Sequence, residues 1–124
     1  MIFLKGRLYV RVVDGLVEGL FYTNEDIPEN YGSFHNEHIA KNRFGDSPEP
    51  AFSSYTELSQ NGAHTFSGRL IEFREASDEC LRDFLSKWDP YRHNLAKWLD
   101  NVDHDTHLLI GEKQRLRYIA SQFL

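Results

Sequence analysis

The sequence predicts an α+β domain, in which an antiparallel sheet is built on an N-terminal β-hairpin and packed on one face by C-terminal amphipathic helices. Three observations predict it. An Asp-Gly pair at residues 14–15 separates two runs rich in Val and Leu. A later run, residues 64–75, again has the alternation of a strand. Apolar residues between Leu81 and Val102 then recur at spacings of three and four, as they do on one face of a helix.

The hairpin turn is predicted at Asp14-Gly15, because the two central positions of such a turn need positive φ. The pairs that follow are Val13–Leu16, Val12–Val17, Arg11–Glu18, Val10–Gly19, Tyr9–Leu20 and Leu8–Phe21. In this register one face is apolar and includes Phe21. The opposite face carries the ion pair of Arg11 with Glu18, beside Leu20.

Residues 24–63 form a loop-rich acidic insertion within a single domain that spans residues 1–124. Ser33 is of a residue type that caps helices, and a short helix is predicted from there to about Phe44, with Phe34 and Ile39 on its inner side. Residues 51–58 favour a strand. The insertion is interpreted either as a functional segment or as a plain insertion without a role.

The second half of the chain is predicted to be one strand, residues 64–75, followed by helices. Ser77 caps the first helix, and its first turn is acidic. Pro90 either kinks one long helix or begins a second helix that Asp89 caps. Residues 111–124 fit an amphipathic helix or a closing hairpin, and the apolar spacing favours the helix.

The distribution of charge indicates which classes of partner this protein could bind. Eight acids against two bases in residues 14–50, and a net charge of −5, disfavour nucleic acid and anionic membranes as partners. The basic cluster of Lys113, Arg115 and Arg117 is short enough to be a solvated helix face. No apolar run approaches the roughly 20 residues of a membrane span. The single cysteine, Cys80, suits a reducing compartment, so we expect the protein in the cytoplasm.

Two histidine pairs are the candidates for chemistry: His35 with His38 in "HNEH", and His104 with His107 in "DHDTH". Four histidines could hold a metal ion if the pairs converged in space, but the spacing H-x-x-H is a weak pattern. Cys80 is expected to be a buried structural residue. There is no G-x-S-x-G turn and no phosphate-binding loop motif. We therefore assign no catalytic residue, metal or cofactor.

The remaining feature is an acidic surface that also bears aromatic residues, which suits a protein interface against a basic partner. Its predicted residues are Glu25, Asp26, Glu29, Tyr31, Phe34 and Glu37. Bacterial immunity proteins and antitoxins that block nucleases are similar in physical type, being small and acidic, although no motif is shared. The leading hypothesis is an inhibitor that occludes the substrate surface of a basic protein such as a nuclease toxin. The alternatives are a small histidine- or metal-dependent hydrolase and a structural subunit of a larger assembly.

Overall fold

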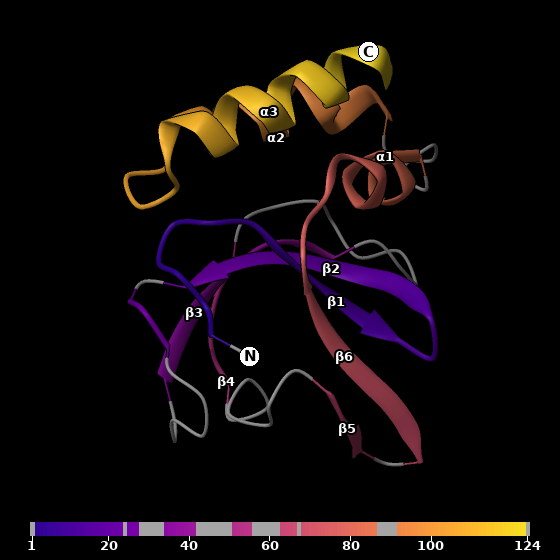
Figure 1. Ribbon diagram of the computed structural model, residues 1–124. Coiled ribbons are helices and arrows are strands. Elements are labelled where there is room, and N and C mark those ends of the chain that lie inside the picture. The colour runs from indigo at the N-terminus through magenta and orange to yellow at the C-terminus, as the bar shows by residue number, and fades with distance from the viewer. Residues whose placement is uncertain are drawn as a thin grey trace.

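The computed structural model describes residues 2–23, 25–27, 34–41, 51–55, 63–66, 68–86 and 92–123 (Figure 1). For residues 34–41, 51–55 and 63–66, and for positions 92–94, 97, 98 and 101, it describes the backbone alone.

Six antiparallel strands form one sheet in this part of the chain, in the order β4-β3-β2-β1-β6-β5. They are β1 (Tyr9–Val13), β2 (Leu16–Thr23), β3 (Phe34–Lys41), β4 (Ala51–Tyr55), β5 (Ala63–Phe66) and β6 (Arg69–Glu75). The helices α1 (Asp78–Ser86), α2 (Arg92–Asp103) and α3 (Ile110–Ala120) follow, and a 3₁₀ turn (Ser121–Phe123) extends the last. Figure 1 shows the helices together in a layer above the sheet. The predicted α+β class, with helices on one face of the sheet, is confirmed.

The predicted hairpin forms, with Asp14 at φ 49° and Gly15 at φ 82° in its turn. Its register is as predicted only as far as the pair Val12–Val17. Beyond that point Arg11 pairs with Gly19, so Glu18 is an extra residue in a β-bulge. Such bulges are common at a glycine inside a strand, because glycine has no side chain to accommodate.

The bulge exchanges the faces that the sequence pattern assigned to the end of β2. Leu20 now pairs with Val10, and Phe21 with Tyr9. Leu20 therefore lies in the core under the helices, and Phe21 lies in a second core on the other face. The assignment of Leu20 to the charged face and Phe21 to the apolar face was wrong, because it assumed a regular ladder.

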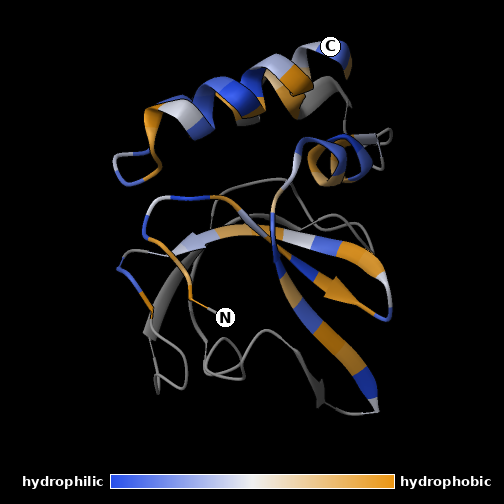
Figure 2. Cartoon of the chain, in the orientation of Figure 1, coloured by the Kyte–Doolittle hydropathy of each residue, from blue (hydrophilic) through white to orange (hydrophobic). Residues whose placement is uncertain are grey.

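The larger core fills the space between the sheet and the helices. It includes Val10, Val12 and Leu20 from the sheet, and Leu81, Phe84, Leu85, Leu95, Leu99, Val102, Leu116, Ile119 and Ala120 from the helices. The stripe predicted for residues 81–102 is thus buried wherever its side chains are described. In Figure 2 apolar residues of α3 and α1 lie on the sides of these helices that face inward, whereas Ile110 at the start of α3 is exposed.

The opposite face of the sheet carries a second, mainly aromatic core, which the sequence did not predict. Its members are Phe3, Tyr9, Val13, Phe21, Ile27, Ile71 and Phe73. The Phe3 ring packs edge-on against the Tyr9 ring, with centroids 4.9 Å apart. Two backbone hydrogen bonds between Phe3 and Ile27, of 2.9 and 2.7 Å, hold the N-terminal segment against the chain that follows β2.

Residues 34–41 are a strand, so the helix predicted from Ser33 to Phe44 is wrong where the structure describes it. β3 pairs with β2 on one side and with β4 on the other. Hydrogen bonding to two neighbours satisfies the backbone of this segment without a helix, and that decides its conformation. The strand predicted in residues 51–58 is confirmed for 51–55.

Residues 63–75 form two strands instead of the single predicted one. Gly68, at φ 75°, lies in the turn between β5 and β6.

The hydroxyl of Ser77 accepts a hydrogen bond from the backbone amide of Cys80 at 3.1 Å, which confirms the predicted cap of α1. The tail forms the helix α3, not a hairpin. Helices α1 and α2 are separate elements, and Asp89 and Pro90 lie outside the described residues. No helix within the described ranges has the length and apolar character that crossing a membrane requires.

Candidate functional site

Two of the predicted partner-binding residues, Glu25 and Asp26, are exposed just beyond the end of β2. An Oδ1 atom of Asp26 accepts a hydrogen bond from the backbone amide of Lys5 at 2.9 Å. This contact fixes Asp26 beside the N-terminal segment. Glu25 makes no side-chain hydrogen bond or ion pair with the described residues, so its charge is directed to solvent.

Glu37 lies on the neighbouring strand β3, close to the same end of the sheet. Glu37 pairs with Tyr22, and the neighbouring pair of Asn36 with Thr23 is the last before Glu25. Phe34 begins the same strand. The backbone positions of Glu25, Asp26, Phe34 and Glu37 therefore gather at one end of the sheet. The side chains of Phe34 and Glu37, and all of Glu29 and Tyr31, lie outside the described residues.

The basic cluster of the tail is used inside the helical layer. Arg117 forms an ion pair with Asp103, and Arg115 bonds Asp78 at 3.3 Å and Glu112 at 3.0 Å. The Lys113 ammonium donates to the backbone carbonyls of Asp103 and Asp105. These cations join α3 to α1 and to the end of α2.

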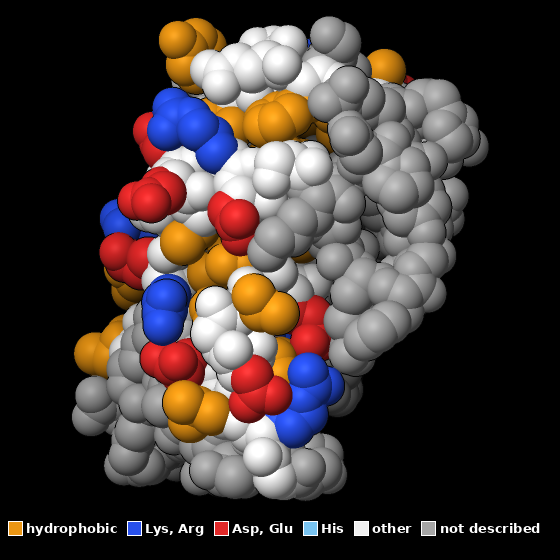
Figure 3. Space-filling model, turned by 90° about the vertical axis from the view of Figure 1, so that its right-hand side faces the viewer, with side chains coloured by type: hydrophobic (Ala, Val, Ile, Leu, Met, Phe, Trp, Pro, Cys, Tyr) orange, Lys and Arg blue, Asp and Glu red, His pale blue; other side chains and the backbone are white. Residues whose placement is uncertain are grey.

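The surface over α1, β6 and the hairpin end is mixed in charge. In Figure 3, Lys and Arg side chains alternate on this face with Asp and Glu side chains and with small apolar patches. One such pair is Arg69 with Asp14, 3.1 Å apart at the hairpin turn. No large field of either sign gathers among the side chains described on this face.

The segment "DHDTH" has a structural role. Asp105 accepts hydrogen bonds from the Tyr22 hydroxyl at 2.7 Å and from the backbone amides of His107 and Leu108. The His104 ring lies 2.7 Å from the backbone carbonyl of Asp100. The carboxylate of Asp105 thus shapes the loop between α2 and α3 and joins it to β2.

The two histidine pairs lie on different elements, His35 and His38 on β3 and His104 and His107 after α2. His35 and His38 are on a strand, so the helical spacing that would let them share one ion is absent. Among the residues described with side chains, no three of His, Cys, Asp and Glu are grouped as metal ligands would be. The side chains of His35 and His38 are outside that set, so their convergence with the second pair stays untested.

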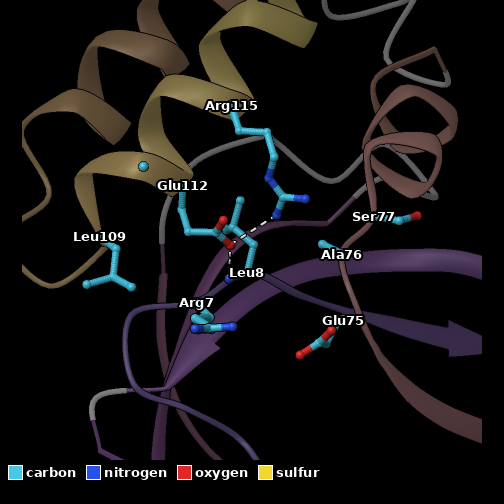
Figure 4. Close-up of a pocket in the computed structure, with 9 residues that line it drawn as sticks. Arg7, Leu8, Glu75, Ala76, Ser77, Leu109, Glu112 and Arg115 are labelled. Carbon is cyan, nitrogen blue, oxygen red and sulfur yellow. Dashed lines mark hydrogen bonds and ion pairs between the residues drawn. The ribbon is translucent and has the colours of Figure 1, made fainter.

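A cavity of about 660 Å³ lies between the sheet and α3. Its wall is formed by the chain before β1, the connection from β6 to α1, and the first turns of α3, which contribute Arg7, Leu8, Glu75, Ala76, Ser77, Leu109, Gly111, Glu112 and Arg115. In Figure 4, Glu112 reaches from α3 toward the backbone of Leu8, and Arg115 descends from the same helix above it. Arg7 and Glu75 line the opposite side, below them.

Sequence reasoning missed this cavity. Its charged residues, Arg7, Glu75, Glu112 and Arg115, come from three separate parts of the chain and share no motif. The one available signal was that Glu112 and Arg115 are three apart on a helix, a spacing that brings two side chains together. Nothing in the sequence connects them with Arg7 or Glu75.

Burial also changes the pKa of Tyr9, the first residue of β1. Removal of the Tyr9 hydroxyl from water raises its pKa above the ordinary value of 10.0, although the hydrogen bond from the Leu4 amide, 2.6 Å long, acts in the opposite direction. Tyr9 therefore stays neutral near physiological pH and serves as an acceptor for the N-terminal segment.

Comparisons of the chain with protein-family models, with curated proteins and with solved structures find no match. The functional argument therefore depends on the geometry and the charges described above.

Proposed function

We propose that this protein is a small acidic inhibitor that acts in the cytoplasm and binds a basic protein, such as a nuclease toxin, over the surface where that protein holds its substrate. The interface consists of the end of the sheet around Glu25 and Asp26, together with Glu29, Tyr31, Phe34 and Glu37. The acids steer the encounter with a cationic surface, and the aromatic side chains anchor the contact.

One observation carries this proposal. The cations of α3 are bonded to acids and carbonyls of their own helical layer, whereas Glu25 is exposed and pairs with no cation among the described residues. Among the described residues that directly follow β2, the exposed charged side chains are therefore the carboxylates of Glu25 and Asp26. Lys5 is the nearest cation along the N-terminal segment, and Asp26 engages its backbone amide, not its ammonium.

The test compares capture of partners from host cells by three proteins: the unaltered chain, the double variant Glu25→Lys with Asp26→Lys, and the control Glu79→Lys. Glu79 is an exposed acid in the first turn of α1, away from the proposed interface. We expect a basic protein that binds the unaltered chain and the control, that is released by added salt, and that the double variant fails to retain.

The captured protein is then purified and tested for cleavage of nucleic acid, with and without an equimolar amount of the inhibitor. Inhibition by the unaltered chain, and its loss with the double variant, would support the proposal. Equal capture by all three proteins, or cleavage that a saturating amount of the chain leaves unchanged, would contradict it.

A further inference from the structure

The outer surface of α3 and of the 3₁₀ turn after it is exposed and contains no charged residue. This surface, the α3 face, consists of Ile110, Gly111, Gln114, Tyr118, Ser121 and Gln122. Ile110 is 72% exposed and Tyr118 is 69% exposed, more than any other large hydrophobic residue that the structure describes. Figure 1 shows α3 along the outside of the helical layer, away from the sheet, where a second molecule could reach it.

The charged residues of α3 lie beside this face and are bonded within the molecule. Their partners are the Leu8 amide for Glu112, backbone carbonyls at and after the end of α2 for Lys113, Asp78 for Arg115 and Asp103 for Arg117. The α3 face therefore offers apolar and amide side chains, and no charge on it has to be removed from water when another surface covers it.

The spacing along α3 makes this face complementary to itself. Ile110 precedes Gln114 by one helical turn, and Tyr118 follows it by one turn, so the three lie in one row. A two-fold axis at Gln114 would place α3 antiparallel to α3 of a second copy. Ile110 of each copy would then meet Tyr118 of the other, with the two Gln114 side chains at the centre. A two-fold interface uses the same surface on both copies, and this row meets that requirement.

The charges along α3 favour the same arrangement. Its first turn contains an acid, Glu112, and its last turn contains a base, Arg117. Antiparallel pairing about Gln114 brings Arg117 within about 2 Å, along the helix axis, of the level of Glu112 in the other copy, and it opposes the two helix dipoles. Parallel pairing would place Arg117 beside Arg117. Each chain has a net charge of −5, so two copies approach most readily over a face without acids.

We propose that the α3 face is the interface of a two-fold symmetric homodimer, in which α3 packs antiparallel to α3 of a second copy about Gln114. A stable dimer buries roughly 800 Å² on each copy, more than one short helix supplies, so we expect a weak dimer with a dissociation constant on the order of 100 µM. This inference goes beyond the function proposed above. Either can fail without the other, because no residue of α3 belongs to the surface around Glu25.

Sedimentation equilibrium from about 10 µM to about 1 mM protein measures the association. The mean mass of the unaltered chain should rise from that of one chain toward that of two. Ile110→Glu and Tyr118→Glu should each weaken association by about tenfold or more, because each places a carboxylate against an apolar residue of the other copy. The matched control is Leu16→Glu at the start of β2, where the side chain is 66% exposed. This control should leave the dissociation constant within about twofold.

Cysteine cross-linking tests the pairing of the helices, in a Cys80→Ser background. A residue on the two-fold axis lies against its own counterpart, so Gln114→Cys should form a disulfide between two copies under mild oxidation. Gln122→Cys makes the same substitution eight residues from the axis. Its two thiols would be about 24 Å apart along the helices, beyond the reach of a disulfide. Circular dichroism of each variant checks that the fold persists.

Three outcomes would overturn the proposal. A mass of one chain at every concentration would favour a different protein as the occupant of the α3 face. Association that Ile110→Glu and Tyr118→Glu leave as strong as Leu16→Glu does would mean that the copies meet over another surface. Equal cross-linking by Gln114→Cys and Gln122→Cys would contradict antiparallel pairing about Gln114.

Discussion

Glu112 on α3 accepts a hydrogen bond from the backbone amide of Leu8 at 2.6 Å, although the two residues are 104 positions apart. Leu8 directly precedes β1, so this bond joins the helical layer to the centre of the sheet. The same carboxylate oxygen accepts from Arg115, and both bonds are partly shielded from water. A bond between a charged acceptor and a backbone donor is stronger than a neutral one.

Replacement of Glu112 should therefore destabilise the fold. We expect Glu112→Ala to lower the free energy of unfolding by about 1–3 kcal/mol, because the Leu8 amide loses its acceptor and Arg115 loses a partner. Glu112→Gln, which retains an acceptor, should cost less. Urea denaturation measures both, with Gln114→Ala at an exposed position of α3 as the control. A change equal to that of the control would show that the bond contributes nothing measurable.

Gly6 is predicted to tolerate no side chain. Its φ is 74°, and a Cβ atom there would lie 2.8 Å from the backbone oxygen of His107 and 3.0 Å from Leu109. Gly68 has nearly the same φ, 75°, but open space around it. Gly68→Ala should cost about 1–2 kcal/mol from backbone strain alone. Gly6→Ala should cost about 1–3 kcal/mol more, from crowding. Thermal unfolding of both variants checks the difference, and equal losses would contradict the contact with the loop after α2.

Phe3 is expected to anchor the N-terminal segment. It is fully buried against the rings of Tyr9, Phe21 and Phe73. Phe3→Ala should lower the free energy of unfolding by about 3–5 kcal/mol, because it removes contacts and leaves a cavity. Phe3→Leu should cost less. Chemical denaturation measures the free energy of unfolding of both variants. A loss below about 1 kcal/mol for the alanine variant would mean that the second core is not packed around this ring.

The turn of the hairpin is expected to lose stability in acid. The hydrogen bond from the Leu70 amide, and then the one from Arg69, hold the pKa of Asp14 below its ordinary value of 3.8. A carboxyl whose pKa is lower in the folded state stabilises it fully above the ordinary value and loses this effect as pH falls through the lowered value.

The variant Asp14→Asn isolates that charge, since asparagine also suits the left-handed turn position. The unaltered chain should melt at a higher temperature than the variant near neutral pH, and the difference should shrink as the pH falls below the ordinary value. A difference in melting temperature that is independent of pH would assign the effect to the turn geometry instead of the charge.

Several elements could be predicted because their signals are local. The Asp14-Gly15 turn depends on two adjacent residues that accept positive φ, and the cap of α1 depends on one hydroxyl placed three residues before an amide. The apolar stripe from Leu81 to Val102 is a periodicity within a short stretch of chain. Each of these signals is complete before the rest of the molecule is considered.

The errors arose where the decision was not local. Ser33 suggested the cap of a helix, but two neighbouring strands supplied the backbone hydrogen bonds that make residues 34–41 a strand. The bulge at Glu18 shifted the register by one residue. Leu20 and Phe21 therefore each lie on the face opposite to the predicted one. A pattern with a period of two contains no information about an inserted residue.

The sequence by itself determined the class of fold, the hairpin turn and the helical stripe, along with a net charge of −5. Only the tertiary structure decided that residues of β1 and β2 form a core on each face of the sheet, that the cations of α3 are bonded within the helical layer, and that Arg7, Glu75, Glu112 and Arg115 line one cavity. The reason is physical. Propensity and periodicity act over a few residues, whereas burial and charge pairing depend on which distant segments the fold brings together.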